Sequence, residues 1–182
     1  SYESVFRYLR CQMSSLTREE VDELENYVIA LGIRGKNRWQ ETWVRVYQGM
    51  ESERILEINE LRRRVMEEFE PLLEGWQGRQ KTVASMTRAL YAFVVKGQMQ
   101  KKLKQQEILF AREGNLAMEK EYAQIYGIVM ELLDKMVAIL GEEPMTLLEY
   151  QQLLEAGLSQ ATVGLIPPSA DQILVGDMER TR

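Results

Sequence analysis

The sequence predicts a mainly α-helical protein: a helical bundle with one small β element at its C-terminal edge. Apolar residues recur at helical spacing through almost all of residues 1–159. Helix start and stop signals separate these stretches from one another. Extended chain is predicted only within residues 160–182. Helices first and strand last is the order expected of an α-helical unit inserted into a sheet-containing domain.

Two helices are predicted at the N-terminal end. The first begins almost at once, because Tyr2 and the apolar residues that follow it recur at helical spacing. The second begins after Thr17, which stands three residues before Glu20 as in a capping box, and it ends at Gly32. The chain from Gly32 to Gly49 is less regular and is rich in basic and aromatic residues.

Longer helices are predicted in the following hundred or so residues. One begins at about Glu51, and we expect Pro71 to kink or end it, because proline lacks the backbone donor that a helix needs. Four further helices are predicted over residues 83–94, 99–110, 116–140 and 146–156. The helix over 116–140 is the longest. Its broad apolar band predicts a central and largely buried element.

The C-terminal residues are predicted to leave the bundle. Residues 172–176 have the alternation of a strand, with Ile173 and Val175 on one face. A single strand cannot satisfy its own backbone donors and acceptors, so we expect its partner strands in further chain after Arg182. This division predicts a helical subdomain over residues 1–159 and an extended segment over 160–182.

Composition excludes several classes of chemistry. The 182 residues amount to about one domain, and no apolar run is long enough to span a bilayer. The chain has no histidine and one cysteine, Cys11, which excludes triads with a histidine base, histidine zinc sites and thiolate clusters. A lone cysteine fits a reducing compartment, so we expect a cytoplasmic protein. The net charge of −5 restricts any nucleic-acid contact to a local patch.

The most distinctive stretch is the basic segment, residues 32–45, with the sequence "GIRGKNRWQETWVR". Its basic residues are Arg34, Lys36, Arg38 and Arg45, and they are interleaved with Trp39 and Trp43. Basic groups neutralise phosphates and an indole face can stack on a base, so the segment has the composition of a DNA-backbone contact. The alternative is that the two tryptophans are core anchors of a short helix, and that the basic side chains are merely solvated.

Other charged and sulfur-containing stretches have simpler interpretations. The lysines of "MQKKLKQQ", Lys101, Lys102 and Lys104, are interpreted as a solvated helix face. The arginines of "ELRRRVMEEFE" are expected to form ion pairs with glutamates of the same helix. The methionines on the predicted apolar stripes are expected to fill the core. No GxxxxGK[ST] loop, GxGxxG turn or nucleophile elbow occurs, so no catalytic residue and no metal-binding or cofactor-binding residue is predicted.

Three stretches resemble a known family. "YESVFRYLR", "LTREEVDELENYVIALGIRGKNRW" and "IPPSADQILVGDMERTR" are similar to AddB, a component of the AddAB helicase–nuclease, which is the ATP-dependent deoxyribonuclease of Gram-positive bacteria. The resemblance is dense over about the first forty and the last twenty residues, and it is loose between them. It implies a helical accessory subdomain of the UvrD type, inserted into the second helicase-like domain, with residues 172–182 leading back into a RecA-like sheet.

The resemblance also implies what lies elsewhere. ATP, magnesium and the iron–sulfur cluster of the family would be bound by other parts of the AddB protein, so this chain alone is expected to be catalytically inactive. An AddA-like protein is the implied partner in a heterodimer. The implied role is the processing of double-strand breaks for recombination, including recognition of the Chi sequence.

Two hypotheses of different classes follow. In the first, the chain is a non-catalytic subdomain that handles DNA, and its candidate contact residues are Arg34, Lys36, Arg38 and Trp39, with Arg180 and Arg182 as lesser candidates. In the second, it is a structural, protein-binding bundle that never touches DNA, and its exposed apolar residues would make the isolated chain self-associate. An independent carboxylate-metal enzyme is disfavoured, because no histidine can complete its ligand sets.

Overall fold

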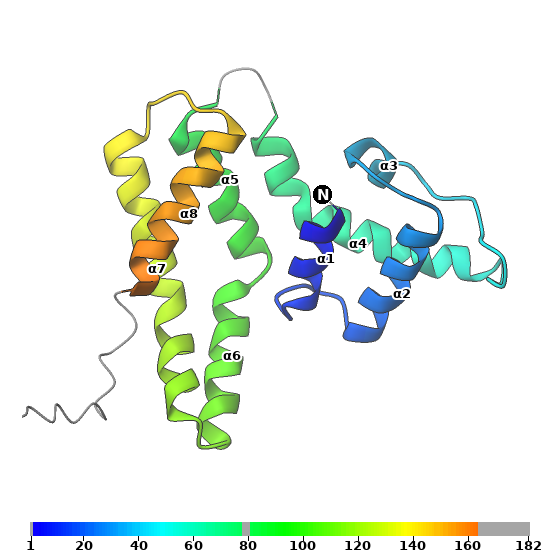
Figure 1. Cartoon of the computed structure of the whole chain (residues 1–182), viewed down its shortest axis with the longest axis horizontal. Coiled ribbons are helices and arrows are strands. Elements are labelled where there is room, and N and C mark those ends of the chain that lie inside the picture. The colour runs from blue at the N-terminus through cyan, green and yellow to red at the C-terminus, as the bar shows by residue number, and fades with distance from the viewer. Residues whose placement is uncertain (1, 78–80, 164–182) are drawn as a thin grey trace, which may run out of the picture.

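The computed structural model describes residues 2–77 and 81–163, and the described backbone is mainly α-helical, as the sequence predicts (Figure 1). Its helices are α1 Tyr2–Arg10, α2 Arg18–Ala30, α3 Lys36–Gln40, α4 Arg54–Gly75, α5 Val83–Lys96, α6 Met99–Arg112, α7 Leu116–Leu140 and α8 Leu147–Val163. Within these ranges the only β pairing is an isolated antiparallel bridge between Thr82 and Pro144. The predicted strand over 172–176 lies outside the described residues.

The predicted ends of α2 are confirmed. Thr17 Oγ1 accepts the backbone N–H of Glu20 at 3.2 Å, and the Glu20 carboxylate accepts the backbone N–H of Thr17 at 2.7 Å. This reciprocal capping box satisfies two backbone donors that the first turn of a helix leaves free. The helix ends at Ala30, and Gly32 follows with a φ of +61°, a left-handed conformation that glycine adopts at little cost.

Helix α4 does not end at Pro71. It continues to Gly75, so the expectation of an end there is wrong, and the kink stays a prediction. Proline removes one intrahelical hydrogen bond, but packing on the far side of Pro71 offsets this loss. Leu72 is buried against α5, and Trp76, the cap residue, packs into two apolar clusters and donates its indole N–H to the carbonyl of Met86.

The first four helices enclose one apolar cluster. Its most buried members come from α1, α2 and α4: Phe6, Leu9, Val21, Leu24, Tyr27, Val28, Ile58 and Val65. The cluster is finished by the two tryptophans of the basic segment, Trp39 and Trp43, each 7% exposed. The basic segment is therefore tied to the core of this half of the molecule through its aromatic residues.

Helices α5, α7 and α8 form a second cluster. Val83 and Met86 of α5 and Tyr150 of α8 are almost completely buried. The Tyr150 hydroxyl lies 2.9 Å from Thr87 Oγ1, which gives both buried polar atoms a partner. Met86 therefore fills the core, as predicted for the methionines on the apolar stripes.

Helices α6 and α7 form a hairpin that extends away from the rest of the molecule (Figure 1). The prediction of a largely buried α7 is wrong for the described residues. Only Leu133 and Met136 of this helix are buried, while Leu116 is 64% and Ile139 is 78% exposed. Helix α7 packs mainly on α6, and most of its apolar band is half-buried rather than buried.

Helix α8 is longer than predicted. It runs to Val163 rather than ending near residue 156, so residues 160–163 are helical and not extended. The apolar positions Leu153 and Leu154 pack against the α5–α7 cluster, and Gly157 lies against Leu132 of α7. The division into residues 1–159 and 160–182 stays a prediction.

Candidate nucleic-acid interface

The basic segment places two cations at the surface next to a glycine. Gly35 has a φ of +81°, and the short helix α3 begins directly after it. Arg34 and Lys36 flank this glycine, and both are exposed. Neither side chain forms an ion pair with another described residue. Their charges are therefore available to an anionic ligand.

The third predicted cation, Arg38, is partly neutralised. Its guanidinium lies 3.3 Å from the carboxylate of Glu41, three residues further along the chain, and both side chains are more than half exposed. An exposed ion pair of this kind is worth little and exchanges readily with solvent. Arg38 can therefore turn to a phosphate, but at the expense of its contact with Glu41.

Trp39 does not present a face to solvent. Its ring packs against Phe6 at a centroid distance of 6.2 Å and edge-on against Trp43 at 5.3 Å. Its carbonyl accepts a 2.8 Å hydrogen bond from Arg62 of α4. Of the two roles considered for Trp39, fixing the segment is the one that this geometry allows. Stacking on a base would require the core to open.

Trp43 anchors the other end of the segment. Its indole N–H donates a 2.7 Å hydrogen bond to the carbonyl of Arg38, and its ring stacks on Tyr27 with an angle of 18° between the planes. The interpretation of both tryptophans as core anchors is confirmed, although Trp43 lies beyond the end of α3. The same anchors tie the backbone of the basic segment to the core, while Arg34, Lys36 and Arg38 are exposed at the surface.

The two free cations border an apolar hollow of about 560 Å³ between α1, α3 and α4. Its lining is mainly apolar and comprises Tyr2, Val5, Trp39, Val65, Met66, Phe69 and Leu73, with Glu3, Arg34, Gly35 and Lys36 at its polar side. Sequence reasoning missed this hollow, because its lining comes from three helices that are far apart along the chain.

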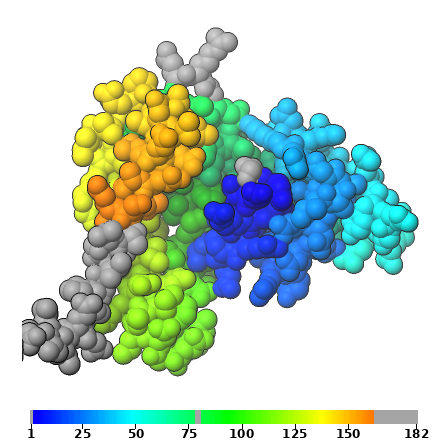
Figure 2. Space-filling view, viewed as in Figure 1, coloured from blue at the N-terminus to red at the C-terminus, as the bar shows by residue number. Residues whose placement is uncertain are grey.

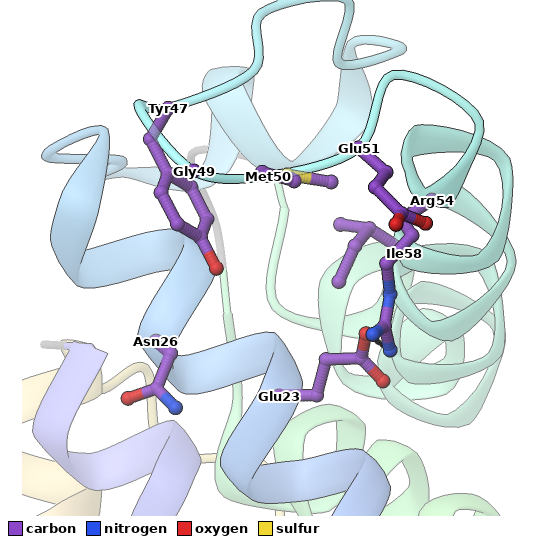
Figure 3. Close-up of a pocket in the computed structure, with 8 residues that line it drawn as sticks. All are labelled: Glu23, Asn26, Tyr47, Gly49, Met50, Glu51, Arg54 and Ile58. Carbon is purple, nitrogen blue, oxygen red and sulfur yellow. Dashed lines mark hydrogen bonds and ion pairs between the residues drawn. The ribbon is translucent and has the colours of Figure 1, made fainter.

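A second hollow of about 440 Å³ lies between α2 and the chain that enters α4 (Figure 3). Glu23 and Glu51 lie on the same side of it as Arg54, and Glu23 forms an ion pair with Arg54. Tyr47 and Asn26 lie on the opposite side. The carboxylates neutralise the single cation, so this hollow has no net attraction for phosphate.

The other basic clusters contain cations that already have partners within the chain. Lys102 donates to the carbonyl of Met13 at 2.6 Å, and Lys104 pairs with Glu107. In the arginine run, Arg63 pairs within α4, as predicted, and its guanidinium holds the pKa of Glu60 below the usual range. Arg64, in contrast, reaches Glu20 of α2 at 2.6 Å. Only part of this run is therefore explained by pairs within one helix.

The structure does not describe the two lesser DNA-contact candidates. Arg180 and Arg182 both lie outside the described residues. Across residues 2–77 and 81–163, no three acidic or cysteine side chains gather as a metal site. In the same ranges no helix combines the length and the apolar character needed to cross a membrane.

Comparison with known proteins gives one consistent answer. No protein-family profile matches the chain. All 182 residues are similar to part of the B component of an ATP-dependent helicase/deoxyribonuclease, at 41% identity for the protein of Lachnoclostridium phytofermentans and at 42% for that of Clostridium novyi. The protein of the same name from Acetivibrio thermocellus is 36% identical over the whole chain.

The match is continuous along the chain. It covers the middle helices as well as the two ends. The chain spans only 16% of the length of the first two relatives and 17% of the third. The resemblance is thus confirmed: over its whole length the chain is related to one part of AddB, the B component of the ATP-dependent helicase/deoxyribonuclease.

Proposed function

We propose that the chain is a non-catalytic helical subdomain of an AddB-type protein and that its basic segment contacts the DNA backbone. One observation carries this proposal: Arg34 and Lys36 are exposed and unpaired among the described residues, on a segment held rigid by two buried tryptophans. Phosphate contacts require cations that are not already paired, and the buried tryptophans anchor the backbone that carries these two.

The whole-protein role is part of the same proposal. The relatives carry the name of a component of an ATP-dependent helicase/deoxyribonuclease, which supports a role for this chain in DNA repair and recombination. In that role the subdomain would hold or guide DNA beside an AddA-like partner in the cytoplasm. ATP hydrolysis and nuclease chemistry would belong to other parts of such a protein.

Fluorescence anisotropy with a labelled forked duplex tests this proposal. A triple variant replaces Arg34, Lys36 and Arg38 with Ala. The matched control changes Arg88, Arg112 and Lys120 to Ala, which removes the same amount of positive charge. These three side chains are also exposed, and none forms an ion pair with a described residue. Each phosphate contact releases counterions, so the slope of log affinity against log salt should flatten by about 2 to 3 in the triple variant and stay unchanged in the control.

Two results would count against DNA contact by the basic segment. One is an equal loss of affinity in both variants, which would show a nonspecific charge effect. The other is the absence of binding by the unmodified chain at low salt. The same three substitutions in the intact AddB–AddA complex would then decide whether DNA contact needs the rest of the assembly.

A second candidate function is favoured by a different observation. Apolar side chains are exposed where α7 ends and α8 begins, with Ile139 78% and Leu148 63% exposed. Exposed apolar patches mark protein-binding surfaces, so the chain would here be a protein-binding bundle without DNA contact. Two measurements discriminate between the candidates. In sedimentation velocity, this candidate predicts self-association that Ile139→Ser and Leu148→Ser abolish. In the intact complex, it predicts that changing Arg34, Lys36 and Arg38 to Ala leaves DNA affinity unchanged.

A further inference from the structure

The chain between α3 and α4 contains a stretch without regular secondary structure and with no strand beside it among the described residues. Residues 42–47, here called the edge segment, run without helix, turn or bend. They lie in the part of the chain that forms one end of the molecule, light blue to cyan in Figure 2. The segment is exposed throughout, apart from Trp43.

One edge of this segment is held by side chains. The Asn59 carboxamide accepts the backbone N–H of Trp43 at 2.9 Å and donates to the backbone carbonyl of Trp43 at 2.7 Å. The Tyr27 hydroxyl donates to the carbonyl of Arg45. The amide of Asn59 thus replaces the two hydrogen bonds that a neighbouring strand would form with residue 43.

The opposite edge has no partner among the described residues. In extended chain the N–H and C=O groups of alternate residues point to the same edge, so those of Val44 and Val46 point away from Asn59. Neither residue forms a backbone hydrogen bond with another described residue. Their β-branched side chains are 82% and 41% exposed, a composition typical of paired strands. An edge of this kind is a template for another strand.

The charge of Arg45 selects among the possible partners. Arg45 is exposed and forms no ion pair with a described residue. Two copies of the chain could pair along their edge segments through the backbone groups of Val44 and Val46, related by a two-fold axis. Arg45 of one copy would then lie directly opposite Arg45 of the other. Like charges directly opposite each other destabilise a strand pair, whereas opposite charges stabilise it. The partner strand should therefore carry a carboxylate at this position.

We propose that the edge segment binds an extended polypeptide strand, with an acidic residue opposite Arg45 and β-branched residues on either side. This is strand addition: the backbone groups of Val44 and Val46 supply the hydrogen bonds, and Arg45 supplies selectivity. The site is distinct from the DNA contact proposed for Arg34, Lys36 and Arg38, and it does not depend on that contact.

A capped peptide of sequence Thr-Thr-Val-Glu-Val-Thr-Thr serves as the probe, titrated into the ¹⁵N-labelled chain and followed by NMR. The amide signals of Val44 and Val46 should shift, and their hydrogen exchange should slow at least tenfold. The Trp43 amide, already bonded to Asn59, should change little. A peptide with Lys in place of Glu should bind at least threefold more weakly, and one N-methylated at both valines should not bind.

Two variants of the chain complete the test. Val44→Pro removes one of the backbone donors and should weaken peptide binding at least tenfold, whereas Val44→Thr keeps the donor and should bind normally. Equal binding by these variants would overturn the proposal, as would unaltered binding of the N-methylated peptide. Shifts that map to other helices, or shifts of Val44 and Val46 caused by DNA and not by the peptide, would overturn it as well.

Discussion

The phenol of Tyr8 on α1 donates a 2.6 Å hydrogen bond to the carboxylate of Glu68 on α4, 60 residues further along the chain. The second carboxylate oxygen accepts the hydroxyl of Ser14 at 3.1 Å. Glu68 is 7% exposed and forms no ion pair with a described residue. The Tyr8 ring also packs edge-on against Phe69 and lies 5.3 Å from the ring of Phe93 on α5. Tyr8 therefore joins α1 to both α4 and α5.

Removing the Tyr8 hydroxyl should destabilise the fold. In Tyr8→Phe, the buried carboxylate of Glu68 loses its shortest hydrogen bond without regaining water. The free energy of unfolding should fall by about 1–3 kcal/mol, measured by urea denaturation. Tyr91→Phe is the matched control, because Tyr91 is 50% exposed. A loss of the same size in both variants would show that the Tyr8–Glu68 bond adds nothing.

Stability should fall in alkaline solution. Burial, reinforced by Glu68, raises the pKa of Tyr8, and burial raises the pKa of Tyr150, both above the ordinary value of 10.0. The unfolded chain therefore releases these two protons at a lower pH than the folded chain does. This stabilisation is fully present below pH 10 and is lost as the pH rises above it.

Urea denaturation midpoints from pH 8 to 11 test this linkage. Tyr150→Phe should show a shallower fall above pH 10 than the unmodified chain. A Tyr150→Phe curve parallel to that of the unmodified chain would mean that the Tyr150 proton is not linked to folding.

The sequence determines much of the local structure. Helix α7 occupies the predicted residues, and the predicted capping box of Thr17 and Glu20 forms with both of its hydrogen bonds. These features depend on residues three or four positions apart, so local patterns are sufficient to predict them. The cations of the basic segment are likewise visible in the sequence, because a charge run needs no tertiary information.

Tertiary features were not predictable in the same way. Periodicity shows that α7 has an apolar band, but it does not show what covers that band, and Val137 within the band is in fact exposed. The continuation of α4 through Pro71 depends on packing against α5. The anchoring of Trp43 by Asn59 joins residues 16 positions apart on different elements. Each of these outcomes is decided by contacts that no local pattern encodes.

Two glycine-to-alanine substitutions should have opposite effects. A Cβ at Gly75 would overlap the Cβ of Ala89, where the end of α4 meets α5. Gly75→Ala should therefore lower the free energy of unfolding by about 1–3 kcal/mol. A Cβ at Gly127, inside α7, would meet open space, so Gly127→Ala should raise it by about 0.5–1 kcal/mol. Thermal unfolding of both variants gives the test, and changes of equal sign would contradict the α4–α5 packing.

Asn59→Asp should loosen the edge segment. The carboxylate could still accept the N–H of Trp43, but it would face the carbonyl of Trp43 without a proton to donate. We expect a loss of about 1–3 kcal/mol in unfolding free energy and a red shift of tryptophan fluorescence, because Trp43 would gain solvent. Asn37→Asp, at an exposed position of α3, is the control. If Asn59→Asp matches that control, the carboxamide is not the anchor.

Amide chemical-shift mapping of the ¹⁵N-labelled chain with a forked DNA duplex tests the central claim most directly. The account predicts that the shifted signals centre on residues 32–41, around Arg34 and Lys36, and that they decline as salt is raised. Shifts centred on the α6–α7 hairpin instead, or a spectrum unchanged by DNA at low salt, would contradict the claim that the basic segment is where this chain meets DNA.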